Sequence, residues 1–176
     1  MTKEKPEHRA LDFKWHLAGD NPAVATTEME FALMRTFESF GRWQSECLVA
    51  VSGITLSGPE NALLHVIRMN DRAKSAKELA RLLNRDDIPN IQYSLRKMIA
   101  DGFVEKQGSS RTGVTYEATD LGCEVTDRYS EIRRKLLVEE IQSLPEFVER
   151  LQSAARTLTI LSGIYEEASR IVATHR

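Results

Sequence analysis

Residues 75–118 read SAKELARLLNRDDIPNIQYSLRKMIADGFVEKQGSSRTGVTYEA, and this stretch decides the fold. Apolar residues recur three and four positions apart in two groups, which predicts two short helices. The groups are Ala76, Leu79, Ala80 and Leu83, and then Ile88, Ile91, Leu95 and Met98. Ser75 and Glu78 have the spacing of a capping box at the first helix. Asp87 is placed to cap the second, in whose first turn Pro89 is tolerated, and Gly102 ends it.

After Gly102 the periodicity changes from helical to extended. Two short strands are predicted at 103–106 and 114–118, and a turn rich in glycine and serine joins them over 107–113. Two packed helices followed by a β-hairpin define a winged helix-turn-helix. In that fold the second helix enters the major groove of DNA.

The segment before this unit predicts an arm and a long helix. Residues 1–22 lack helical periodicity and are expected to form a mobile arm. Apolar residues then recur at helical spacing, and we assign residues 23–56 to dimerisation. A further capping box, Ser57 and Glu60, begins the winged unit of residues 57–118.

Residues 119–176 predict the C-terminal dimerisation helices. Thr119 is placed to cap the first of them, whose apolar face carries Leu121, Val125, Ile132 and Leu136. Pro145 opens the last helix, where spacings of four and three alternate through Phe147, Leu151, Ala154, Leu158, Leu161, Tyr165, Ala168 and Val172. Such a seam packs on another helix, and nothing else in the chain is left to cover it. We therefore predict a homodimer of a mainly α protein.

Composition and charge limit the classes of function. The chain has 176 residues, 41% of them hydrophobic, and only two cysteines. No apolar run approaches the roughly 20 residues that span a bilayer, and the charged start resembles no secretory signal. We therefore expect a cytoplasmic protein with no membrane partner. The net charge is −2, yet residues 65–118 carry 10 basic and 7 acidic side chains. The basic excess lies in the segment predicted to bind DNA.

The polar face of the helix at 87–101 predicts the contacts with DNA. Asn90, Gln92 and Tyr93 lie nearest its start, where bases are contacted, and amide side chains pair bidentately with adenine. Pro89 lies on the same face. Arg111 in the hairpin is placed to reach the adjacent minor groove. Phosphate contacts, which set register and affinity, are assigned to Ser75, Lys77, Arg96 and Lys97.

A set of short motifs runs through the chain in a fixed order. They are Glu78-Leu79-Ala80, Ile91…Leu95…Met98-Ile99-Ala100-Asp101-Gly102-Phe103-Val104, Arg111, and Thr119-Asp120-Leu121-Gly122. Over about residues 25–142 this order resembles the MarR family of bacterial transcription regulators. The resemblance implies a triangular homodimer whose first and last helices interlock, and whose two winged helices each bind half of a palindromic duplex. It also implies that Arg111 is the wing-tip arginine.

Three features depart from the family pattern. The turn at 84–87 is one residue longer than usual, and Ser109 stands where an acidic residue usually precedes the wing arginine. Asp86 and Asp87 bring negative charge close to the expected phosphates. Within the family, Phe40-Gly41-Arg42-Trp43 together with the segment 84–97 is similar to a proteobacterial subgroup associated with control of an L,D-transpeptidase and osmotic tolerance.

The resemblance also implies an effector site. Many MarR proteins bind a small aromatic or amphipathic molecule between the dimer helices and the winged domain, which here implicates Phe37, Phe40, Trp43 and His65. Aromatic residues at helical spacing also form ordinary cores. We expect a repressor that an effector releases from DNA.

Two alternatives stay open. Some winged helices bind proteins, so the chain could be an interaction module without DNA binding. Cys47 could be a thiol redox sensor, although its place on the apolar stripe beside Glu46 favours an inert thiol. The four histidines lack metal-ligand spacing, and no catalytic or phosphate-binding motif occurs. We expect no metal, no cofactor and no enzymatic activity.

Overall fold

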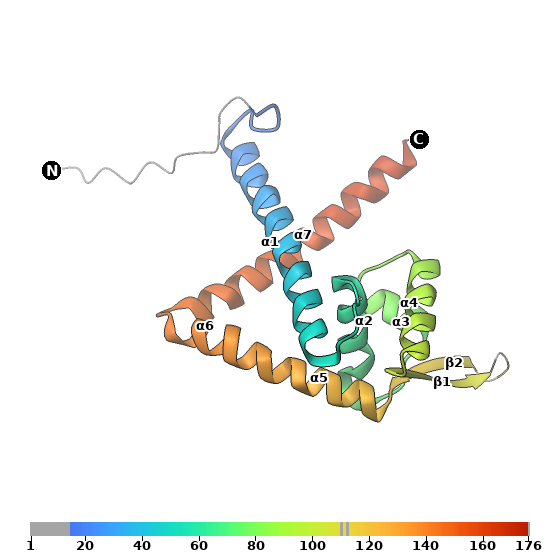
Figure 1. Cartoon of the computed structure of the whole chain (residues 1–176). Helices are drawn as coiled ribbons and strands as arrows, with labels where there is room; N and C mark the ends of the chain where they lie inside the picture. Colours follow the sequence, from blue (N-terminus) through green and yellow to red (C-terminus); the bar gives the residue numbers. More distant parts are fainter. Residues whose placement is uncertain (1–14, 110, 112, 176) are drawn as a thin grey trace. The chain divides into compact units, whose positions relative to one another are not determined.

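The computed structural model describes residues 15–109, 111 and 113–175. The chain divides between Thr126 and Asp127 into two compact units, which are described separately. The element order is α1 (Asn21–Ser52), α2 (Gly58–Arg68), α3 (Ala76–Leu82), α4 (Ile88–Ala100), β1 (Val104–Ser109), β2 (Gly113–Ala118), α5 (Asp120–Arg133), α6 (Glu139–Ser143) and α7 (Phe147–Thr174). The predicted class, a mainly α winged helix-turn-helix, is confirmed (Figure 1).

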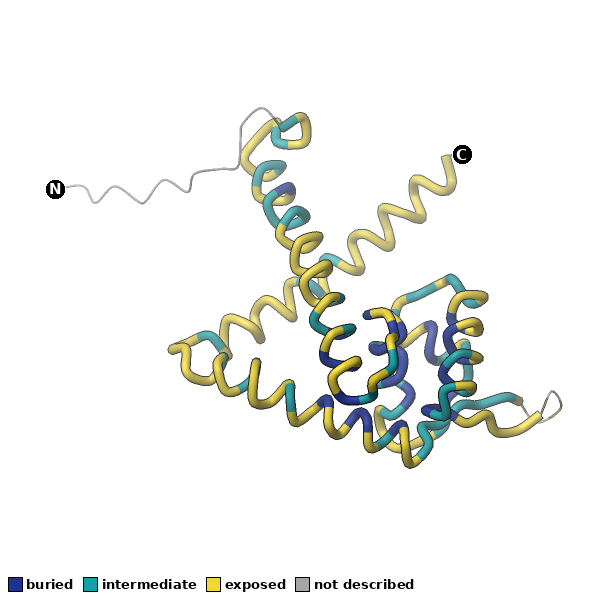
Figure 2. Tube along the Cα trace, viewed as in Figure 1, coloured by how far each residue is buried: buried dark blue, intermediate teal, exposed yellow. Residues whose placement is uncertain are grey.

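The core of the first unit lies where α2, α3 and α4 meet the C-terminal half of α1 (Figure 2). Each helix buries one apolar stripe, as the periodicity predicts. The side chains with no more than 1% exposure include Leu48, Leu63, Leu64, Leu79, Ile91, Leu95 and Met98. Burying such a side chain is worth about 1.5–3 kcal/mol, so these contacts fix α4 against the other helices.

The hairpin is antiparallel, and its strands are longer than predicted. β1 continues to Ser109 and β2 begins at Gly113, with Gln107 opposite Thr115 and Ser109 opposite Gly113. The predicted turn at 107–113 is therefore too long, because Gln107, Gly108, Ser109 and Gly113 pair in the ladder. The hairpin projects from the end of α4 away from the helices (Figure 1).

Of the two predicted capping boxes, only that of Ser57 and Glu60 at α2 forms completely. The Ser57 amide donates to Oε2 of Glu60 at 2.8 Å, and the Glu60 amide donates back to the Ser57 hydroxyl. At α3 the Glu78 amide donates to Ser75 Oγ at 3.2 Å, but the Glu78 carboxylate pairs with Arg72 instead of returning to the cap. A nearby guanidinium is a stronger partner than a backbone amide, so this capping box is only half formed.

A buried lysine organises the connection between α2 and α3. Lys74 is fully buried, and its ammonium donates to the carbonyls of Ile67, Met69 and Arg72, at 2.8 Å for the first and 2.9 Å for the last. Burial lowers the pKa of Lys74, and the positive charge of Arg72 acts in the same direction. Lys74 also exchanges backbone hydrogen bonds with Tyr116 of β2, which ties this connection to the hairpin. The sequence analysis missed this residue.

The start of α5 buries only part of the predicted face. Gly122 and Val125 are buried, whereas Leu121 is exposed. A Cβ on Gly122 would lie 2.1 Å from the carbonyl oxygen of Phe103, so only glycine permits this approach. The Thr119 hydroxyl accepts from the Gly122 amide at 3.1 Å, which confirms the predicted cap. The buried side of the helix carries Gly122, Val125, Thr126 and Tyr129, and its smallest residue makes the closest contact.

The N-terminal boundary of α1 also differs from the prediction. The helix begins at Asn21, with the Asp20 carboxylate accepting from the Ala23 amide at 2.9 Å. Pro22 lies in the first turn, where the missing amide costs nothing. Residues 21 and 22 are therefore helical, and most of the predicted mobile arm lies outside the described residues.

The described part of the second unit is helical apart from residues 144–146 and 175. α5 runs into a π-helical stretch, Arg134–Val138, followed by α6 and α7. Pro145 does not open α7: the helix begins at Phe147, after Glu146 in the left-handed region at φ 59°. Most of the predicted seam is exposed in the single chain, including Val172 at 59% (Figure 2).

Candidate nucleic-acid interface

The two faces of α4 separate as predicted. Its inner face buries Ile91, Leu95 and Met98, which holds the opposite face towards solvent. Tyr93 is 62% exposed although it is a large aromatic residue. The exposed residues on this outer face are Pro89, Asn90, Gln92, Tyr93 and Arg96. Their amides, hydroxyl and guanidinium form a continuous set of donors and acceptors that suits the edges of bases.

Lys97 does not belong to this exposed set. Its ammonium pairs with Oε2 of Glu60 at 3.0 Å and donates to the carbonyl of Thr55 at 3.3 Å. Burial opposes the charge of Glu60, but hydrogen bonds from Ser57 and Lys97 lower its pKa on balance. In the free chain the Lys97 ammonium is engaged in an internal ion pair, because its position on α4 faces the start of α2, and this arrangement does not favour the phosphate contact predicted for Lys97.

The start of α4 is held by side chains rather than by a conventional cap. Asp87 occupies the N-cap position, but its carboxylate bonds no backbone amide of the helix. It accepts instead from Arg85 Nε at 2.7 Å and Nη2 at 2.6 Å, and from Asn90 Nδ2 at 3.1 Å. The hydrogen bonds from Arg85, then from Asn90, lower the pKa of Asp87 to about 2. The prediction that the Asp87 carboxylate caps the helix is therefore wrong, because that carboxylate bonds the side chains of Arg85 and Asn90 and no helix amide.

The remaining predicted contacts lie on α3 and the hairpin. Lys77 and Arg111 are exposed, whereas Ser75 is half-buried and engaged in its cap. Along the hairpin, the Gln107 amide donates to Glu105 at 3.0 Å and to Glu117 at 2.8 Å. This bridge holds two carboxylates on one side of the strands.

A cavity of about 790 Å³ opens between α1, α2 and the turn that follows α3. Phe37 and Phe40 line it from α1, and Arg85 lines it from the turn. Trp43 and His65 do not line it, so only half of the predicted effector residues meet there. The helices touch at its edge, since a Cβ on Gly58 would lie 2.9 Å from the Cα of Gly41. The other charged lining residues, Glu38, Arg42 and Glu46, are exposed.

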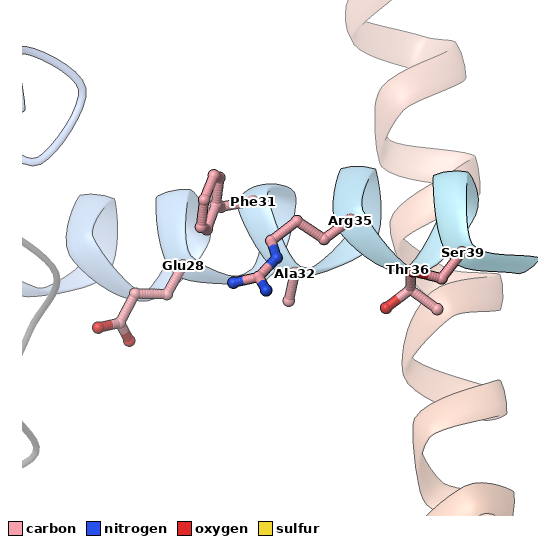
Figure 3. Close-up of a pocket in the computed structure, with 6 residues that line it drawn as sticks. All are labelled: Glu28, Phe31, Ala32, Arg35, Thr36 and Ser39. Atoms are coloured by element: carbon pink, nitrogen blue, oxygen red, sulfur yellow. The ribbon is translucent and has the colours of Figure 1, made fainter.

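A second hollow lies on α1 alone, and Figure 3 shows its lining. Arg35 folds back along the helix over the ring of Phe31, 5.6 Å from its centroid, and Trp15 meets the same ring edge-on at 5.7 Å. All six lining residues belong to this one helix. A ligand site needs groups that converge from several elements, so this groove is a surface feature.

Other chemistry finds little support in the described part of the chain. Cys47 is 4% exposed, and burial raises the pKa of its thiol. Among residues 15–109, 111 and 113–175, no group of three or more His, Cys, Asp or Glu is arranged to hold a metal. No helix within those same ranges is long and apolar enough to cross a membrane.

Comparisons with known proteins support the winged-helix assignment. Residues 56–122 match the family model of the winged helix DNA-binding domain. No curated protein matches the sequence. A cysteine-to-serine mutant of MarR from E. coli, solved with operator DNA, superposes with a TM-score of 0.62 at 17% identity, covering 79% of this chain and 99% of that one.

Two other solved structures agree in fold. The transcriptional regulator BldR from Sulfolobus solfataricus gives a TM-score of 0.63 at 15% identity, covering 80% of this chain and 99% of that chain. RV1404 from Mycobacterium tuberculosis gives 0.59 at 17% identity, covering 82% and 96%. The chain therefore has the winged-helix fold of MarR-type regulators, which confirms the predicted resemblance at the level of the fold. None of these comparisons distinguishes a subgroup.

Proposed function

We propose that this protein is a sequence-specific, DNA-binding transcription regulator that acts in the cytoplasm as a homodimer and is not an enzyme. The observation that carries the proposal is the outer face of α4, where Asn90, Gln92, Tyr93 and Arg96 are all exposed in a winged-helix unit. A helix face that is merely solvated would not require amide side chains at its first turn and an arginine further along. The match of residues 56–122 to a DNA-binding domain supports the same conclusion.

Dimerisation is supported by the apolar exposure of α7. Val172 and Leu151 of the predicted seam are 59% and 42% exposed in the single chain. Ile160 and Ile164, outside the seam on the same helix, are more than half exposed. Such a surface is unfavourable in water unless a second helix covers it. A symmetric pair of winged helices reads a palindrome, with half-sites about 34 Å apart.

Effector control is supported by the cavity beside α1. Phe37 and Phe40 provide an apolar wall, and Arg85 connects that wall to Asp87 at the start of α4. We propose that a small aromatic or amphipathic molecule binds there and changes the spacing of the two reading helices, which releases a repressor from DNA. Unchanged helix spacing in an effector complex would count against this mechanism.

The alternatives gain less support. A thiol sensor needs an accessible thiolate, but Cys47 is buried and its pKa is raised. An interaction module without DNA binding gives no reason for the exposed amides and Arg96 on α4.

The test is fluorescence anisotropy of the full chain on duplexes selected from a random pool, across a salt series. We expect nanomolar binding of a palindrome and a salt dependence that corresponds to roughly 6–10 phosphates. Arg96→Ala is expected to weaken binding, whereas Lys135→Ala, which removes an exposed charge outside the winged unit, should leave it unchanged. If no palindrome is enriched, the interaction module becomes the better explanation.

A further inference from the structure

One carboxylate at the turn between α3 and α4 joins an ion pair to a base-reading side chain. Arg85 donates through Nε and Nη2 to the two oxygens of Asp87, at 2.7 and 2.6 Å. Asn90 Nδ2 donates to Oδ2 of the same carboxylate at 3.1 Å. The planar guanidinium fixes the plane of the carboxylate, because two parallel hydrogen bonds leave it no rotation.

The Asp87 carboxylate makes these contacts in place of the usual N-cap hydrogen bond. An aspartate at an N-cap normally accepts from an amide of the first turn. Here the amides of Asn90 and Ile91 donate to the main-chain oxygen of Asp87, and its side chain turns to Arg85. A hydrogen bond between two charged groups is stronger than one from a neutral amide to a carboxylate, so the proximity of Arg85 favours this arrangement.

The consequence for Asn90 is a defined amide orientation. One N–H of its Nδ2 points to Asp87, which leaves its Oδ1 and the second N–H available on the exposed start of α4. Adenine presents an acceptor at N7 and a donor at N6 in the major groove, which is the complement of that pair. A freely rotating amide would present the two groups in either order.

We propose that Arg85 and Asp87 are positioning residues that hold the Asn90 amide in the orientation that recognises adenine. The ion pair also neutralises Asp87, which would otherwise repel the phosphates beside α4. This inference rests on the proposed function, since it specifies how α4 reads DNA.

The test measures specificity separately from affinity. Duplexes are selected from a random pool with the full-length wild type, and the position read by Asn90 is the one whose preference Asn90→Ala abolishes. Asp87→Ala is expected to lower the adenine preference at that position on the order of tenfold. The double variant should lose no more preference than Asn90→Ala alone, because both changes act through one amide. Circular dichroism verifies that each variant is folded, and Asp87→Asn replaces Asp87→Ala if the latter is not.

Matched variants isolate the ion pair. Asp86→Ala removes the neighbouring exposed carboxylate without touching Arg85 or Asn90, and should retain the adenine preference. Arg85→Met should lose the preference, and Arg85→Lys should restore it only in part, because an ammonium cannot make the paired contact.

Three results would overturn the inference. Asp87→Ala could weaken every duplex equally and keep the preference, which would indicate a structural role with DNA binding intact. Asn90→Ala could leave every base preference unchanged while the wild type still selects a sequence, which would show that Asn90 does not read a base. If the wild type selects no sequence, the proposed function fails and the inference falls with it.

Discussion

Replacing Lys74 with methionine tests whether one buried ammonium holds the connection between α2 and α3. The methionine fills similar space but donates no hydrogen bond, so the carbonyls of Ile67, Met69 and Arg72 lose their shared partner. A hydrogen bond to a charged group contributes about 1.5–3 kcal/mol, and an orphaned buried carbonyl costs about 1–3 kcal/mol. The variant no longer desolvates an ammonium, which offsets part of that loss.

The expected net cost of Lys74→Met is therefore about 2–4 kcal/mol in the free energy of unfolding. Urea unfolding followed by circular dichroism measures it, at one fixed protein concentration because the proposed dimer makes stability concentration-dependent. In a chain of this size the change corresponds to a fall in Tm of about 4–16 °C.

Lys77→Met is the matched control, because Lys77 is exposed on α3. It should change the unfolding free energy by less than about 0.5 kcal/mol. Equal effects of the two variants would refute the conclusion that the Lys74 ammonium stabilises this connection.

Three further predictions concern the close approach of Gly122 to Phe103, the ion pair of Arg85 with Asp87, and Lys97. Gly122→Ala should destabilise the protein by about 2 kcal/mol or more, since its Cβ would lie 2.1 Å from a carbonyl oxygen, whereas Gly19→Ala, which meets open space, should be neutral in the same urea assay. The pKa of Asp87 is about 2 against an ordinary 3.8, so its contribution to stability is present above pH about 4 and lost as the pH falls through 2. In acid titrations, the difference in unfolding free energy between the wild type and Asp87→Asn should therefore be constant above pH about 4 and shrink as the pH falls towards 2. Arg96→Ala should reduce the salt slope of DNA binding by about one, and Lys97→Met should leave the slope unchanged; equal slopes for the two variants would contradict the internal pairing of Lys97.

Much of α4 was predictable from the sequence. Periodicity identified the buried stripe of α4 and therefore its exposed face, because both follow from 3.6 residues per turn. The position of Lys97 is the exception. It lies at the border between the faces, and its direction depends on Glu60, which is 37 residues away in the chain.

The cap assignments show the same limit. Ser57 and Glu60 form their box although Lys97 also pairs with the Glu60 carboxylate, because Oε2 of Glu60 accepts from the Ser57 amide and from the Lys97 ammonium together. Glu78 and Asp87 also stand at positions where a carboxylate can accept from an amide at a helix start, but each carboxylate pairs with an arginine instead. Sequence spacing states which bonds are possible, and the stronger charged partner decides which one forms.

The sequence by itself determined the element order, the winged-helix class and the outer face of α4, since these depend on local propensity and on the period of apolar residues. Only the tertiary structure decided which face of α5 is buried, where Lys74 places its ammonium, and that Phe37, Phe40 and Arg85 meet at one cavity. Each of these depends on groups distant in the chain, and the approach of one backbone to another, as at Gly122 and Phe103, leaves no periodic signal in the sequence.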